Sequence, residues 1–142
     1  LDFDFNDIES GFKRVVISEA VTPNQNPSIS QWALDGIPID AGDPVVVAPG
    51  STHELAVTLA EGTIEEYTYV NADNIIEIRK EEPYVNWYTS SGTIGSPVSL
   101  DPFLESSWTA PDTLGFTGTL WAVVRDRRGG LNWSSQPFSV NP

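Results

Sequence analysis

Hydrophobic and polar residues alternate along most of the chain, and the clearest example is residues 118–140. Residues 120–125 are rich in aliphatic and β-branched types, which favours a largely buried strand. Residues 126–130 contain paired glycines that accept positive φ, so they are expected to form a turn. Residues 131–140 are then predicted to return as a second strand. Because Pro137 has no amide proton, this second strand is expected at the edge of a sheet.

The same pattern recurs from Ser28 onward, with turn signals roughly every eight to twelve residues, the spacing of an antiparallel sandwich. No window shows helical periodicity. A hairpin is predicted over residues 63–79, around a turn at residues 71–74, and the acidic residues near it indicate that it projects into water. The other strands are predicted at residues 29–34, 37–40, 45–47, 53–60, 84–90, 98–100 and 104–109.

The alternation also predicts a hydrophobic core. On a strand, every second side chain points to the same face, so Val85, Trp87 and Thr89 share one face. Leu55, Val57 and Leu59 likewise share one face of a half-buried strand.

Two prolines and several turn-forming residues interrupt the pattern at residues 21–27. We therefore predict an N-terminal arm and linker at residues 1–27 and a single sandwich domain at residues 28–142. The arm is expected either to fold back on its own domain or to dock on a neighbour.

Four segments resemble one family: NPSISQWALDG at residues 26–36, NWYTSSGTI at 86–94, SSWTAPD at 106–112 and TLWAVVRDRRGG at 119–130. They resemble bacterial extracellular immunoglobulin-like domains, close to the polycystic-kidney-disease type, of secreted and lipid-anchored surface proteins. The chain departs from simple members in its N-terminal arm and its hairpin insertion near Asn71. It also lacks the cysteine pair of antibody domains.

The resemblance implies a two-sheet Greek-key sandwich in which Trp87 is the central core aromatic and Trp108 enters from the opposite sheet. It also implies that Leu120, Ala122 and Val124 face inward from the penultimate strand. If residues 120, 122 and 124 point inward, the alternate positions of these strands point outward. We expect Tyr84, Tyr88, Trp121, Val123, Arg125 and Trp133 to share the outer face of one sheet.

An exposed aromatic surface of this extent is more than a monomer usually leaves uncovered. We hypothesise that it is an interface, occupied either by Phe3, Phe5 and Phe12 of the arm or by a partner protein. An alternative is that register shifts separate these rings. A carbohydrate-binding module is another alternative, because flat aromatic platforms on β-sandwiches stack on sugar faces.

The formal net charge of −13 comes from 20 acidic and 7 basic residues. This balance argues against nucleic acid and anionic membrane surfaces as partners, because both select for lysine and arginine. The absence of cysteine excludes thiol nucleophiles, disulfides and cysteine-ligated zinc. No stretch approaches the roughly 20 apolar residues of a membrane span, so any lipid anchor or other attachment is expected upstream of Leu1.

Catalytic and metal-binding patterns are weak. His53 is the only histidine and has no nucleophile motif around it, so we expect a solvated histidine at a strand end. The paired glutamates at residues 65–66 and 81–82 alternate faces on a strand and do not form an acid/base pair. Asp35, Asp40, Asp43 and Asp126 lie at strand ends, where they are candidate calcium ligands, but capping of turns by aspartate explains them better. We predict no catalytic residues, no metal and no cofactor.

Together these patterns predict a non-catalytic structural or protein-interaction module. The resemblance and the absence of an initiator methionine favour a processed protein of the bacterial periplasm or cell surface. A neighbouring domain or an assembly subunit is the expected partner.

Overall fold

The computed structural model describes residues 22–40 and 42–142, and these residues form twelve strands and no helix. The prediction of an all-β fold is confirmed. The strands are β1 (Ile29–Leu34), β2 (Ile37–Ile39), β3 (Val45–Val47), β4 (Thr52–Leu59), β5 (Glu66–Val70), β6 (Ile76–Lys80), β7 (Tyr84–Thr89), β8 (Thr93–Ile94), β9 (Val98–Leu100), β10 (Glu105–Thr109), β11 (Thr117–Arg125) and β12 (Leu131–Val140).

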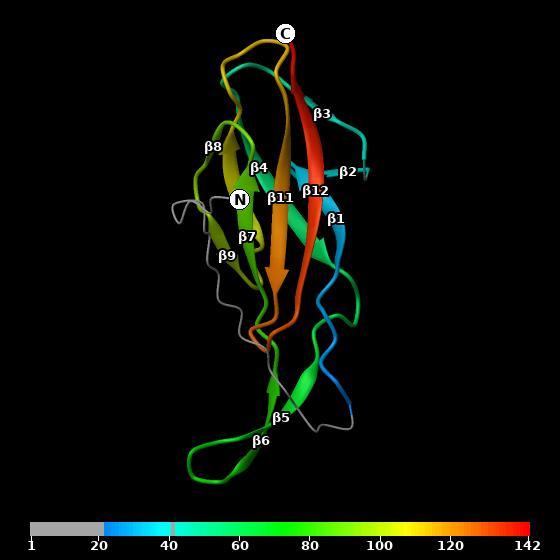
Figure 1. Ribbon diagram of the computed structural model, residues 1–142, viewed down its shortest axis with the longest axis vertical. Helices are drawn as coiled ribbons and strands as arrows, with labels where there is room; N and C mark the ends of the chain where they lie inside the picture. The colour runs from blue at the N-terminus through cyan, green and yellow to red at the C-terminus, as the bar shows by residue number, and fades with distance from the viewer. Residues whose placement is uncertain (1–21, 41) are drawn as a thin grey trace, which may run out of the picture.

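Ten of these strands form two five-stranded sheets that pack together as a sandwich (Figure 1). One sheet has the order β2-β1-β4-β10-β8, and the other has the order β3-β12-β11-β7-β9. The two-residue strand β8 was not predicted from the sequence. Neighbouring strands run antiparallel except for β12 and β3, which are parallel.

The core lies between the two sheets and follows the alternation of the sequence. On β11, Leu120, Ala122 and Val124 are buried while the residues between them are half-buried. Trp87 on β7 and Trp108 on β10 are also buried, and they come from opposite sheets. On β4, Leu55 and Val57 are buried, and Leu59 is half-buried against the same core.

The prediction that Pro137 places its strand at a sheet edge is wrong. β12 lies between β11 and β3, and its register with β3 pairs Phe138 with Val45 and Val140 with Val47. This pairing begins only at Phe138, one residue after the proline. The missing amide proton therefore costs the β3 ladder nothing, and a central strand accommodates the proline.

The predicted hairpin is confirmed, and it forms a separate two-stranded sheet of β5 and β6. It extends beyond one end of the sandwich (Figure 1). Its turn is closed by Asn71, whose Oδ1 accepts hydrogen bonds from the amides of Asp73 and Ile75 at 3.0 and 2.9 Å. Asn74 adopts a positive φ of 58°, a conformation that asparagine tolerates better than most residues.

Candidate interaction surface

The strand register places the predicted outer residues on one face of the second sheet. Trp121 lies opposite Tyr88, Arg125 lies opposite Tyr84, and Val123 lies opposite Trp133. All six therefore occupy alternate positions on β7, β11 and β12, on the side of the sheet that points away from the core. We call Tyr84, Tyr88, Trp121, Val123, Arg125 and Trp133 the outer aromatic face.

Two rings of the outer aromatic face are the most accessible. Tyr88 is 51% exposed and Trp133 is 60% exposed, whereas Tyr84, Trp121, Val123 and Arg125 are half-buried. Arg125 donates from Nε to Asn86 Oδ1 at 3.3 Å, which holds the guanidinium close to the sheet. The face is thus chiefly aromatic, with one cation at its end.

The outer aromatic face continues onto the edge strand β9. Val98 and Leu100 are exposed there, and Leu100 lies opposite Tyr84. These residues line a shallow, open hollow together with Arg127, whose guanidinium carbon lies 5.8 Å from the centre of the Tyr84 ring. The strand at residues 98–100 is predicted from the sequence, but the face of Val98 and Leu100 is not, because three residues give too little alternation to assign one.

The arm phenylalanines Phe3, Phe5 and Phe12 lie outside the described residues. The described chain begins at Thr22, and Asn24 and Asn26 contact the β11–β12 turn and the start of β12. Asn24 Nδ2 donates to Asp126 Oδ2 at 2.6 Å, and Asn26 Oδ1 accepts from the Leu131 amide at 3.2 Å. The linker is therefore held at the end of the sandwich where β11 and β12 meet.

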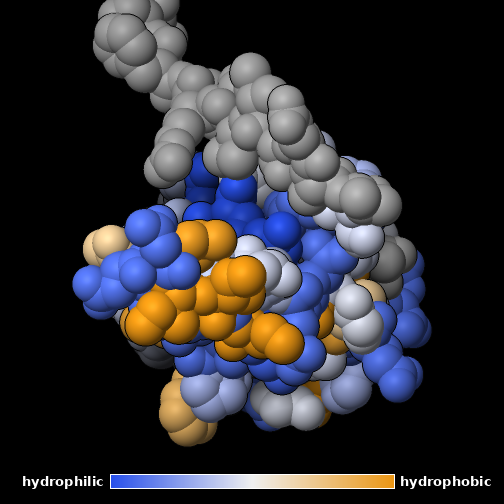
Figure 2. All heavy atoms as spheres, turned by 90° about the horizontal axis from the view of Figure 1, so that it is seen from below, coloured by the Kyte–Doolittle hydropathy of each residue, from blue (hydrophilic) through white to orange (hydrophobic). Residues whose placement is uncertain are grey.

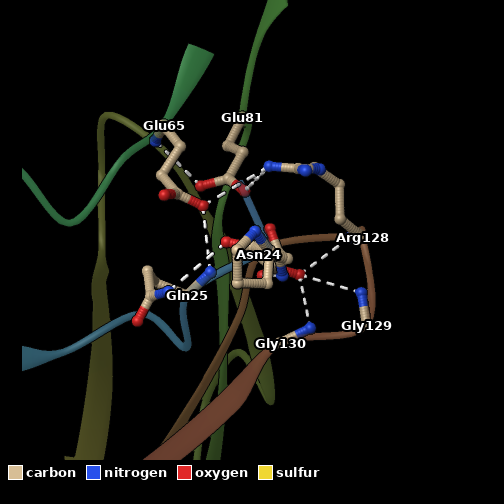
Figure 3. A network of polar contacts seen from close by, with 9 residues as sticks. Asn24, Gln25, Glu65, Glu81, Arg128, Gly129 and Gly130 are labelled. Atoms are coloured by element: carbon tan, nitrogen blue, oxygen red, sulfur yellow. Dashed lines mark hydrogen bonds and ion pairs between the residues drawn. The ribbon is translucent and has the colours of Figure 1, made fainter. Parts of the chain in front are cut away.

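A polar network fixes this end of the molecule (Figure 3). The buried Asp126 accepts from the amides of Arg128, Gly129 and Gly130 through Oδ1, at 2.7, 3.0 and 2.9 Å. Arg128 Nη1 donates to the buried Glu81 at 2.8 Å and lies 3.5 Å from Glu65. Because Glu65 and Glu81 flank the β5–β6 hairpin, the network joins linker, turn and hairpin base.

The candidate calcium ligands do not converge on one site. Asp35 and Asp126 accept hydrogen bonds from nearby backbone amides. Asp126 holds its own turn, as described above. Asp40 and Asp43 lie in the loop between β2 and β3, where the Asp43 amide donates to the Asp40 carbonyl at 3.4 Å. Within the described residues, no group of three or more histidine, aspartate or glutamate side chains is arranged to hold a metal ion.

His53 is not the solvated side chain that the sequence suggested. Its ring is half-buried, with Nδ1 2.7 Å from Asp35 Oδ2 and Nε2 2.7 Å from Ser51 Oγ. His53 is held in this way because the β1–β2 turn brings Asp35 against the start of β4. There Asp35 Oδ1 also accepts from the Glu54 amide at 2.8 Å. The hydrogen bond with His53, followed by that with the Glu54 amide, lowers the pKa of Asp35 below its ordinary value of 3.8.

Ser51, His53 and Asp35 are linked by hydrogen bonds in the same order as the serine, histidine and aspartate of a catalytic triad. The groups around them do not suit acyl transfer. Ser51 Oγ lies 2.6 Å from the Ala48 carbonyl oxygen, which competes with His53 for the single hydroxyl proton. The amides that would stabilise an oxyanion are occupied, because Ser51 donates to Ala48 and Gly50 donates to Pro111. The three side chains instead join the β1–β2 turn to β4 and to the turn before it.

The hairpin carries a second apolar surface that the sequence analysis missed. Val70, Ile75, Ile76 and Ile78 are between 56% and 77% exposed. Figure 2 shows a contiguous hydrophobic patch on the molecule seen from this end. The signal is present in the sequence, because Ile76 and Ile78 alternate with charged residues on β6.

Comparison with known proteins supports the fold and goes no further. No protein-family model matches the chain, and no curated protein matches its sequence. It is similar in structure to part of a nucleoside hydrolase-related hypothetical protein from Saccharophagus degradans that is associated with carbohydrate metabolism. The TM-score is 0.50 at 13% sequence identity, over 83% of this chain and 26% of the other. This chain thus corresponds to about a quarter of that protein's length.

The described residues contain no helix long and apolar enough to cross a membrane.

Proposed function

We propose that this chain is a non-catalytic, immunoglobulin-like interaction module of a bacterial surface or periplasmic protein. The strand order supports the fold assignment. The series β1-β4-β10 in one sheet and β12-β11-β7 in the other corresponds to the A-B-E and G-F-C series of immunoglobulin sandwiches. The hairpin of β5 and β6 is then an insertion between the second and third core strands. A location outside the cytoplasm rests on the family resemblance.

The outer aromatic face is the observation that carries the proposed role. Its three strands present Tyr84, Tyr88, Trp121 and Trp133 in register on the side away from the core. Large aromatic rings with a peripheral arginine are typical of the anchor residues of protein interfaces. We assign this face to docking of an extended segment that carries its own apolar side chains.

The N-terminal arm supplies such a segment through Phe3, Phe5 and Phe12. The linker is held beside the β11–β12 turn, at one end of the outer aromatic face. An extended chain spans about 3.3 Å per residue. Fully extended, the 21 residues before Thr22 could span about twice the length of the ten-residue strand β12. The arm therefore has the reach to cover the face of its own domain or of a neighbour in an assembly.

Disulfide trapping tests this proposal, because the chain contains no cysteine. In a Phe5→Cys and Ser135→Cys double variant, one thiol is on the arm and the other is next to Trp121 on the outer side of β12. Oxidation is expected to give a crosslinked monomer if the arm covers its own domain and a crosslinked oligomer if it covers a neighbour. The matched control replaces Ser135→Cys by Ser107→Cys, on the exposed side of β10 in the other sheet.

Equal crosslinking of the two double variants, or no crosslinking of either, would contradict docking of the arm. Trp121→Ser and Trp133→Ser, introduced into the first double variant, are expected to lower its yield. The exposed Phe103, which lies between β9 and β10 and off the outer aromatic face, provides the control Phe103→Ser.

A carbohydrate-binding module is the second candidate, because of the spacing of the two exposed rings. Tyr88 on β7 and Trp133 on β12 flank β11 and are offset by two residues along the strands, so at the usual strand spacing and rise their positions are about 12 Å apart. Two flat rings at such a distance suit stacking on neighbouring sugars. The structural relative is itself associated with carbohydrate metabolism. Affinity electrophoresis in polysaccharide gels, with Trp133→Ala as the variant, distinguishes this function from protein docking.

A further inference from the structure

The β5–β6 hairpin is a two-sided ribbon, and its two faces differ. The register pairs Val70 with Ile76, Thr68 with Ile78, and Glu66 with Lys80, and all six side chains are exposed on one side. We call these six residues the hairpin face.

The opposite side of the ribbon is already occupied by contacts within the chain. Arg79 lies over the Tyr69 ring, with its guanidinium carbon 3.7 Å from the ring centre, and it donates to Glu77 at 2.8 and 2.9 Å. Arg128 lies over Tyr67 at 4.3 Å and holds the hairpin base through Glu81. The ribbon is therefore anchored with its aliphatic residues outward.

The two outer edges of the hairpin sheet are also unpaired within the described residues. Among residues 22–40 and 42–142, β5 and β6 pair only with each other, so each has one edge unpaired by the described chain. A two-stranded sheet with exposed aliphatic residues on one side is only marginally stable alone and is stabilised by packing against another layer. The structure shows no such layer within the described residues.

The charges of the hairpin face indicate which kind of partner it binds. The chain carries a net charge of −13, whereas the hairpin face carries one acid and one base, Glu66 and Lys80, and is locally neutral. A two-fold axis along the hairpin places β5 of one copy over β6 of another. Glu66 then meets Lys80 of the second copy, and Val70 meets Ile76 of the second copy. The face is complementary to itself, as an isologous contact requires.

The position of the hairpin leaves its face accessible to a second copy. The apolar patch is visible when the molecule is viewed along its long axis from the hairpin end (Figure 2). A two-fold axis along the hairpin leaves the direction from its base to its tip unchanged, so the two acidic bodies lie at the same end of the contact and repel each other.

We infer that the hairpin face binds the hairpin face of a second copy of this chain, forming a two-fold dimer. The contact buries aliphatic side chains and leaves repulsion between the two bodies as the opposing force. Added salt screens that repulsion and strengthens apolar association, so the dimer forms more readily at high salt. Docking on a cationic partner would show the opposite salt dependence.

Sedimentation velocity of the full chain over a range of concentrations, at low and at high salt, tests this inference. Ile76→Ser and Ile78→Ser are each expected to lower the association constant roughly tenfold or more, because each removes a buried aliphatic side chain from both copies. Ile37→Ser changes an equally exposed isoleucine on β2, in the main sandwich, and is expected to leave association within about twofold. Thermal unfolding of each variant verifies that it is folded.

Charge reversal distinguishes a second copy from any other partner. Glu66→Lys alone and Lys80→Glu alone are expected to weaken association, because each places like charges opposite one another. The double variant E66K/K80E restores complementarity between two identical copies and is expected to recover association. A chain that stays monomeric at every concentration and salt, a double variant that does not recover, or association that phosphatidylcholine vesicles abolish would overturn the inference.

Discussion

The indole rings of Trp32 and Trp87 meet edge to face between the two sheets, with ring centroids 5.7 Å apart and an interplanar angle of 77°. Each indole also donates one hydrogen bond. Trp32 Nε1 donates to Ser134 Oγ at 2.9 Å, and Trp87 Nε1 donates to Ser99 Oγ at 2.8 Å. The pair thus fixes the separation of the sheets by packing, while the two serines fix the orientation of each ring.

Replacing Trp87 with alanine is therefore expected to destabilise the domain by about 3–5 kcal/mol, because it opens a cavity beside Trp32. Trp87→Phe is expected to cost less but still to leave the hydroxyl of Ser99 without its donor. Urea unfolding followed by circular dichroism measures both. Trp133→Ala on the outer face serves as the control, and an equal loss in that variant would contradict the assignment of Trp87 to the core.

Local alternation was enough to place the outer aromatic face. Residues 126–130 form the turn that the paired glycines predicted, and this sets Val123 opposite Trp133. Once the turn is fixed, the faces of β11 and β12 follow from strand geometry alone. The sequence could therefore predict which rings share a face, although it could not show what covers them.

Features that depend on distant pairing were not predictable in the same way. The expectation that Pro137 marks an edge failed because β3, some 90 residues earlier, pairs only with the residues after it. The contact between His53 and Asp35 forms because β1 pairs with β4, a register that no local pattern specifies. The Trp32 contact with Trp87 likewise needs the packing of two sheets.

Asp126 is expected to be a key residue for the end of the sandwich that holds the linker. Its two carboxylate oxygens accept three amides of its own turn and the side-chain amide of Asn24. Asp126→Ala leaves these buried donors without an acceptor and is expected to cost about 2–4 kcal/mol. Chemical denaturation measures the loss. Asp112→Ala, at an exposed aspartate, is the control, and similar stability of the two variants would contradict this role.

The contact between Asp35 and His53 predicts a dependence of stability on acid. Because hydrogen bonding lowers the pKa of Asp35 below 3.8, its ionised form stabilises the folded state above that pH. The contribution is lost as the pH falls through the lowered value. Asp35 is half exposed, so solvent screening limits the effect to about 1 kcal/mol or less.

Urea unfolding of the unmodified chain and of Asp35→Asn, from neutral pH down to below 3.8, measures this contribution. The difference in unfolding free energy between the two chains is expected to be largest near neutrality and to shrink in acid. Carboxylates common to both chains cancel in the difference. A difference that stays constant over the whole pH range would show that the charge of Asp35 does not contribute to the free energy of unfolding.

The neighbouring residues Arg127 and Arg128 provide a matched test of how burial changes the value of an ion pair. Arg128 contacts Glu81, whose side chain is 1% exposed, whereas Arg127 contacts Glu82, whose side chain is 76% exposed. Arg128→Ala leaves a buried carboxylate without its partner and is expected to cost about 2–4 kcal/mol, while Arg127→Ala is expected to cost less than about 0.5 kcal/mol. Removing the stranded charge with Glu81→Gln should recover much of the loss from Arg128→Ala. Equal losses for the two arginines, measured by denaturant unfolding, would mean that Glu81 reaches water in the folded chain and that the hairpin base is not fixed by this pair.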